Sequence, residues 1–208
     1  MFAIMMDDEW YPIIGDPSLM GWFTVAAYFV AALLCWRASV TAKRTRPPGV
    51  IPASALFWFA LVVFLIFLGI NKQLDLQTWL TALAKQLSKA QGWYENRRIV
   101  QIIFIALVAL GGILFFAGLV WLTRARWKSH WLALAGSMFL ACFIVVRAAS
   151  FHHIDQWLGW RIGGLKVNWI LELGGIGCIA FSAWKNSRKS SLEKKRSHEI
   201  FATTAVRR

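Results

Sequence analysis

The chain has 208 residues, of which 58% are hydrophobic, and its mean hydropathy is +0.54. An ordinary soluble domain needs a polar exterior, so this composition excludes one. The formal net charge is +13. The three cysteines share no CxxC spacing, which argues against a zinc or disulfide framework.

Five apolar stretches are each close to the roughly 20 residues that a hydrocarbon core of about 30 Å requires. None of them carries a polar stripe over most of its length, as a buried helix of a soluble protein would. The sequence therefore predicts an all-α, polytopic membrane protein with about five transmembrane helices, forming one domain over residues 19–184. In chain order the stretches are Leu19–Trp36, Ala53–Ile70, Ile99–Leu122, Trp131–Ala149 and Val167–Trp184.

Two further segments are predicted to differ from plain loops. Between residues 74 and 90, leucines recur at helical spacing among lysines and glutamines, which predicts an amphipathic helix lying on the outer surface. Such a helix could serve as an interfacial strut or as a lid. The segment 185–208 is rich in Ser and Lys and predicts a disordered tail.

The orientation follows from the distribution of charge. Segments 37–52, 123–130 and 185–208 hold 15 of the 23 Lys and Arg residues and only two acidic residues. The remaining chain holds eight basic and eight acidic residues. By the positive-inside rule, the basic segments are expected in the cytoplasm and the N-terminal tail, residues 1–18, in the periplasm. An orientation signal that can also contact anionic lipid accounts for the basic charge, so no nucleic-acid partner is expected.

Polar residues inside the predicted spans point to a function, because burying them in lipid is costly. Gln101, Arg147 and Glu172 all lie within about two turns of the outer boundary. Arg147 and Glu172 lie on consecutive antiparallel spans and can form a structural ion pair. Alternatively, they belong to a site that binds a ligand or partner. The predicted members of that site are Asn71, Lys72, Asp75, Arg97, Arg98, Gln101, Arg147 and Glu172.

A histidine motif follows the fourth span. On a continuing helix, Ser150 and His153 share a face, as do His152 and Asp155. A carboxylate beside an imidazole suits a general base, a metal ligand or an interfacial histidine with a structural hydrogen bond. The predicted catalytic set is therefore Ser150, His152, His153 and Asp155. A divalent metal such as zinc would use His153, Asp155, Asp75 and Glu172, although no HExxH spacing supports it.

Glycines are frequent in the third and fifth spans and predict tight helix packing. The absence of an internal repeat and of broken spans argues against a transporter built on inverted repeats. The glycines are Gly111, Gly112, Gly118, Gly174, Gly175 and Gly177.

The segments GINKQLDLQT, QGWYENRR and RAASFHHID together resemble an uncharacterised family of small bacterial membrane proteins. Some members of that family are labelled isopropylmalate isomerases. The resemblance implies a bacterial inner membrane and a periplasmic outer face, but no activity. Nothing in the chain resembles a soluble iron–sulfur isomerase. The motif Ser150–Asp155 is also similar in residue type to membrane hydrolases that include alkaline ceramidases, but it lacks their HxxxH spacing, so no roles are carried over.

Two functions remain open from the sequence. The favoured one is an integral inner-membrane protein that binds a partner protein, a lipid or a ligand at the periplasmic boundary. The alternative is a small membrane-embedded hydrolase or lipid-modifying enzyme, with or without a metal. The substrate and any cofactor are not specified by either interpretation.

Overall fold

The computed structural model describes residues 16–44, 47, 49–74, 97–149, 161–162 and 165–206, with side chains placed over most of these ranges. Five helices lie within them, and all five contain a segment long and apolar enough to cross a membrane. The prediction of an all-α protein with five such helices is confirmed. The predicted interfacial helix covers residues 74–90, and only Leu74 of it is among the described residues. The helices are α1 (Leu19–Arg44), α2 (Ala53–Leu74), α4 (Arg97–Thr123), α5 (Trp127–Ala149) and α7 (Val167–Val206).

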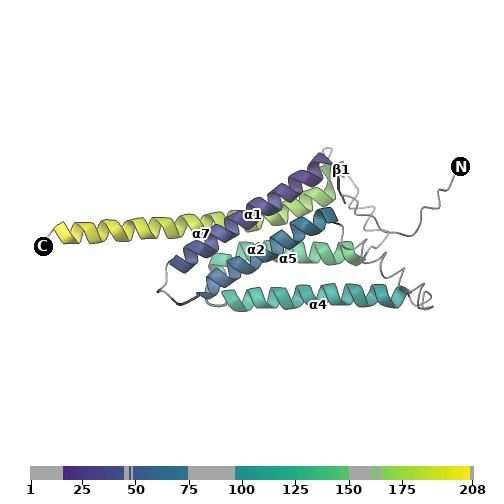
Figure 1. Ribbon diagram of the computed structural model, residues 1–208, viewed down its shortest axis with the longest axis horizontal. Coiled ribbons are helices and arrows are strands. Elements are labelled where there is room, and N and C mark those ends of the chain that lie inside the picture. The colour runs from purple at the N-terminus through teal and green to yellow at the C-terminus, as the bar shows by residue number, and fades with distance from the viewer. Residues whose placement is uncertain are drawn as a thin grey trace.

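Consecutive helices run in opposite directions along one bundle (Figure 1). We call the end where α1 and α7 begin the polar end, because it holds Lys72 and Glu172. The opposite end, where α1 finishes at Arg44 and α5 begins at Trp127, we call the basic end. A short antiparallel hairpin, β1 (Arg161–Ile162) and β2 (Leu165–Lys166), directly precedes α7.

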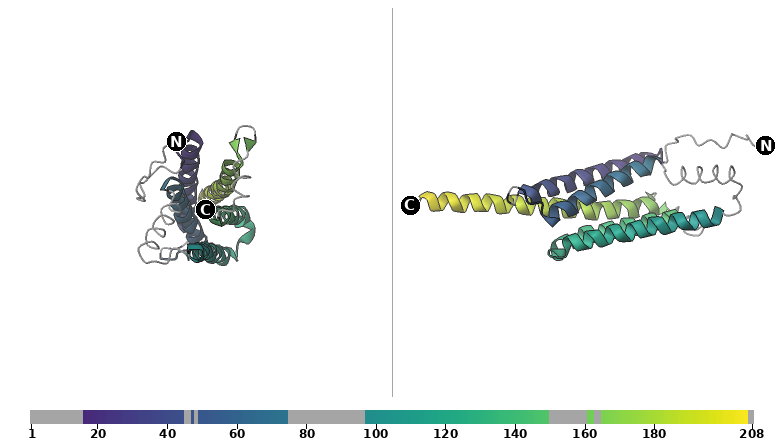
Figure 2. Two further views of the ribbon diagram at one scale, coloured as in Figure 1. Left: turned by 90° about the vertical axis from the view of Figure 1, so that its right-hand side faces the viewer. Right: turned by 60° about the horizontal axis from the view of Figure 1, so that its bottom comes forward.

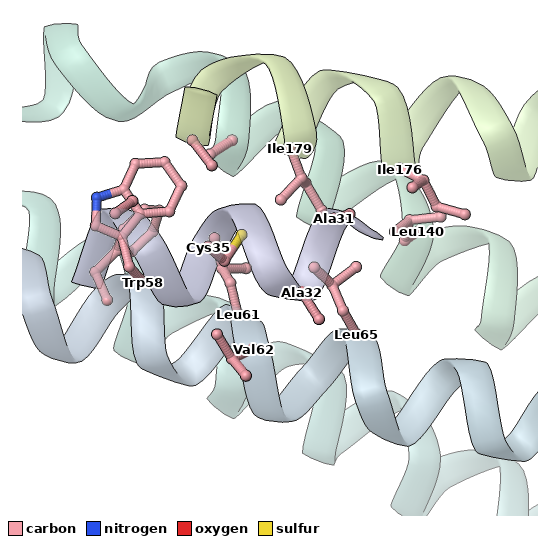
Figure 3. Close-up of a cluster of buried hydrophobic side chains, with 14 of the residues drawn as sticks. Ala31, Ala32, Cys35, Trp58, Leu61, Val62, Leu65, Leu140, Ile176 and Ile179 are labelled. Carbon is pink, nitrogen blue, oxygen red and sulfur yellow. The ribbon is translucent and has the colours of Figure 1, made fainter. Parts of the chain in front are cut away.

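The bundle is organised around α1 and α7. Helix α1 packs against α2 and α7, whereas α5 packs against α7 and α4 (Figure 2). The α1 face toward its neighbours is built from small residues at helical spacing, including Ala31, Cys35 and Ala38, all completely buried. Small side chains let larger ones such as Leu61 and Ile179 pack closely against the α1 backbone (Figure 3).

Tight packing is shown by only some of the glycines. A Cβ on Gly136 of α5 would lie 2.8 Å from the carbonyl oxygen of Gly175 on α7, so these backbones meet directly. A Cβ on Gly175 would meet Leu140 at the same distance. The prediction is therefore correct for Gly175. It is wrong for five others, because no described atom lies within 4 Å of where their Cβ would be. These are Gly111, Gly112, Gly118, Gly174 and Gly177.

Local sequence explains where α1 begins. Ser18 is its N-cap, since its Oγ accepts a hydrogen bond of 3.0 Å from the Gly21 amide. The Asp16 carboxylate in turn accepts hydrogen bonds from the Ser18 amide and hydroxyl. Gly21 has no room for a Cβ, because Asp16 lies against it. The capping residues thereby hold Asp16 at the polar end.

The basic end differs from expectation in α7, which continues as a helix through Val206. The Ser- and Lys-rich composition predicted a disordered tail over 185–208, and the structure shows helix for residues 185–206 instead. The physical reason lies in what the segment lacks: no Pro or Gly follows Gly177. A helix already nucleated inside the bundle can therefore extend without an interruption.

Candidate functional site at the polar end

A buried ion pair joins α2 and α7. Lys72 Nζ lies 2.7 Å from Glu172 Oε2, and the two side chains are 3% and 4% exposed. Removing two charges from water costs several kcal/mol for each ion, so such a pair is tolerated only with close geometry and additional hydrogen bonds. Paired intramembrane charges of this kind are frequent at functional sites.

Tyr28 of α1 supplies the additional hydrogen bond. Its hydroxyl donates to Glu172 Oε1 at 3.0 Å, and its side chain is buried. Gly69 of α2 makes room for it, because a Cβ there would lie 3.2 Å from Tyr28 Cβ. Both oxygens of the Glu172 carboxylate therefore have a partner, and three helices meet at one side chain.

A second carboxylate lies beside the pair. Asp16 Oδ2 accepts a hydrogen bond of 3.3 Å from Trp169 Nε1, and the Asp16 carbonyl oxygen accepts one of 3.4 Å from Gln73 Nε2. Burial raises the pKa of Asp16, but hydrogen bonds from Ser18 and Trp169 and the charge of Lys72 together lower it below its usual range. Asp16 therefore stays ionised at neutral pH.

Two buried acceptor atoms at this end have no hydrogen-bond partner among the residues that the structure describes. They are Oε1 of Gln73 and Oδ1 of Asn168. Gln73 follows Lys72 in α2, and Asn168 lies one turn before Glu172 on the same face of α7. An amide oxygen accepts hydrogen bonds, so both atoms match a ligand that carries N–H or O–H groups.

We refer to these side chains together as the polar end cluster. Its titratable members carry two carboxylates against one ammonium group, which favours a cationic or donor-rich ligand. The cluster consists of Asp16, Tyr28, Lys72, Gln73, Asn168, Trp169 and Glu172.

The structure brings together two of the residues that the sequence predicted, Lys72 and Glu172. Asn71, also predicted, precedes Lys72 and is partly exposed. The structure gives Glu172 the partners Lys72 and Tyr28. The sequence offered Arg147 as one of two interpretations, a structural ion pair or a ligand site. Arg147 lies near the end of α5, and its side chain is not among the described ones.

Much of the predicted site is not tested by this structure. The helix positions of Arg97, Arg98 and Gln101 are in the first two turns of α4, but their side chains are not described. Among the described residues, no three His, Cys, Asp or Glu side chains gather as metal ligands would. Of the predicted catalytic and metal-binding residues, only Glu172 is described. The others, namely Asp75, Ser150, His152, His153 and Asp155, lie outside the described ranges.

Sequence reasoning missed most of the residues around the ion pair. Tyr28 was not singled out, although a hydroxyl inside an apolar span needs a hydrogen-bond partner. Asp16 was counted with the tail, although the run Asp16–Pro17–Ser18 is a helix-start signal. Asn168 and Trp169 open a span and carry no signal of their own in the sequence.

Comparison with protein-family models, with curated proteins and with solved structures gave no match to this chain. Function is therefore inferred from the polar end cluster itself.

Proposed function

We propose that this protein is an integral protein of a bacterial inner membrane that binds an amine-bearing lipid head group through the polar end cluster. The observation that carries the proposal is the buried Lys72–Glu172 pair. A buried ion pair is weak evidence for a purely stabilising role, because apolar residues of similar size often stabilise a fold equally well. A role in recognition accounts for its place at the end of a membrane-spanning bundle.

The choice of ligand chemistry follows from the unpartnered atoms. Oε1 of Gln73 and Oδ1 of Asn168 accept but cannot donate hydrogen bonds. A primary ammonium group offers three donors and a positive charge, which matches both acceptors and the excess of carboxylates. A head group at the membrane boundary lies at the depth of this cluster, because Lys72 is two residues from the end of α2.

The orientation in the membrane is part of the same proposal. Exposed basic side chains at the basic end support a cytoplasmic location for that end and a periplasmic location for the polar end cluster. These side chains are Arg37, Lys43, Arg44, Arg124, Arg126 and Lys128. Fusing green fluorescent protein or alkaline phosphatase to the C-terminus tests it. Fluorescence without phosphatase activity is expected, and the reverse pattern would overturn the orientation.

Lipid binding is tested by native mass spectrometry of the full chain with phosphatidylethanolamine and phosphatidylcholine. The two head groups carry the same charges, but only the first has N–H donors. We expect retention of phosphatidylethanolamine over phosphatidylcholine, with the preference lost in the Gln73→Leu/Asn168→Leu double variant. Ser39→Ala, at the basic end, is the control that keeps the preference. Equal retention of both lipids by the wild type would refute the proposed ligand.

A further inference from the structure

The basic end contains a second pair of buried polar groups, which do not belong to the polar end cluster. Trp58 of α2 is fully buried and His130 of α5 is 2% exposed. Within the described part of the chain, neither Trp58 Nε1 nor His130 Nε2 has a hydrogen-bond partner. Most buried polar groups in proteins are hydrogen-bonded, so two neighbouring exceptions need an explanation.

The two nitrogens are complementary. His130 Nδ1 lies 3.1 Å from the carbonyl oxygen of Arg126, which can only accept, so Nδ1 carries the proton. In the neutral imidazole, Nε2 then has a free lone pair and acts as an acceptor. The indole Nε1–H of Trp58 is a donor only. Two neighbouring rings thus carry one unsatisfied donor and one unsatisfied acceptor.

The rings form a compact aromatic group. The Trp58 and His130 ring centroids are 5.4 Å apart and the ring planes are tilted by 41°. Phe57 contacts both rings edge-on, with centroids 5.0 Å from each. Since α2 packs mainly on α1 and α5 mainly on α7, these rings link two helices that are not principal neighbours.

We propose that Trp58 and His130 form a binding site for a single water molecule that connects α2 to α5. The water accepts a hydrogen bond from Trp58 Nε1–H and donates one to His130 Nε2. The ligand has to be both donor and acceptor, and it has to be small because the surrounding rings are buried. A metal ion does not fit, since it needs three or four ligands and the indole N–H offers no lone pair.

Nuclear magnetic resonance on the full chain in nanodiscs, with ¹⁵N-labelled Trp and His, tests the site directly. We expect cross-relaxation between the Trp58 indole proton and water, and its loss in His130→Phe, which keeps a ring but removes both nitrogens. Trp169, whose Nε1–H donates to Asp16, is the internal reference. A scalar coupling across a direct Trp58–His130 hydrogen bond would overturn the proposal. So would the absence of the water signal in the wild type.

A double-mutant cycle gives a second readout in case the resonances are weak. Trp58→Phe and His130→Phe each leave the other group of the bridge without its partner. The effect of the double variant on the unfolding equilibrium constant should therefore differ by about tenfold from the product of the two single effects. His130→Gln, which keeps an acceptor near the Nε2 position, should retain part of the coupling. The control is Ser137→Ala, since the Ser137 hydroxyl already donates to Leu134. Its effect should add to that of Trp58→Phe. Full additivity for Trp58 and His130 would contradict a bridging water.

Discussion

The two ends of the bundle bury polar groups in different ways. At the polar end the buried groups include charged ones, and both oxygens of Glu172 have a partner, from Lys72 and Tyr28, whereas the two acceptor atoms without a partner are neutral amide oxygens. At the basic end they are neutral, and Trp58 and His130 each keep one unpartnered nitrogen. The difference follows from the free-energy cost of burying each kind of group. An unpartnered neutral group costs about 1–3 kcal/mol, whereas a buried ion costs several kcal/mol unless it is paired.

The ends also differ in which helices they connect. Glu172 joins α1, α2 and α7, whereas the rings of Trp58 and His130 join α2 to α5. Helix α2 is thus held at its two ends by different partners. The charged end depends on three side chains acting together, and we expect it to be the more sensitive to single substitutions.

The largest effect is expected from breaking the ion pair. Lys72→Met leaves the Glu172 carboxylate buried with Tyr28 as its remaining partner, which should cost about 3–5 kcal/mol of unfolding free energy. The double variant Lys72→Met/Glu172→Leu should recover most of that loss, because no charge remains buried. Lys43→Met, at an exposed position of the basic end, is the control. Denaturant unfolding of the protein in micelles measures all three. A loss below about 1 kcal/mol for Lys72→Met would show that the pair is not buried as described.

A smaller contrast is expected from removing one hydroxyl at each end. Tyr28→Phe deletes a hydrogen bond to a charged carboxylate, which should cost about 1.5–3 kcal/mol. Ser39→Ala deletes the bond from Ser39 Oγ to the Ala55 carbonyl, 2.9 Å long and between neutral groups, which should cost about 0.5–1.5 kcal/mol. The same unfolding measurement compares them. Equal losses would remove the distinction between a charged and a neutral end.

Hydrophobic length was enough to predict much of the fold. The starts of α1, α2 and α7 were placed correctly at Leu19, Ala53 and Val167, because each follows a polar, Pro-containing or Gly-containing segment and opens an apolar run. The end of α5 at Ala149 was also correct. Bilayer thickness fixes the length of such runs, so composition carries this information.

The partner of Glu172 could not be predicted in the same way. Lys72 lies 100 residues away in sequence, and their contact depends on how the helices are ordered around the bundle. Arg147 was a candidate partner because α5 and α7 are consecutive antiparallel spans, and those helices do pack together. Helix α7 also packs against α1, however, and the Glu172 carboxylate meets Tyr28 and Lys72. Hydropathy does not distinguish these two sides of a helix.

Between the two ends, the backbones of α5 and α7 meet directly at Gly136 and Gly175, and we expect a third kind of sensitivity to substitution there. Gly136→Ala places a methyl group 2.8 Å from the Gly175 carbonyl oxygen, a backbone atom that cannot rotate away. Overpacking of this kind should cost about 1–3 kcal/mol. Gly111→Ala, on α4 with open space around it, should be neutral or stabilising by up to about 1 kcal/mol from helix propensity. Thermal unfolding of both variants tests this contrast. Equal changes in stability for the two variants would contradict it.

The smallest effect is expected at Asp16, which lies ahead of α1. Its lowered pKa means that the folded state favours the ionised carboxylate, so its contribution is present at neutral pH and is lost as the pH falls through that lowered pKa. Asp16→Asn keeps the shape and one acceptor oxygen, which can serve Ser18. It replaces the oxygen that accepts from Trp169 with an NH2 group and removes the charge that faces Lys72. We expect a loss of stability of less than about 1 kcal/mol at pH 7, vanishing in strongly acidic solution where the wild-type carboxylate is protonated. Thermal unfolding of both proteins at several pH values measures the difference. A difference independent of pH would mean that Asp16 acts through its hydrogen bonds alone. The ionic character of the polar end would then be confined to Lys72 and Glu172.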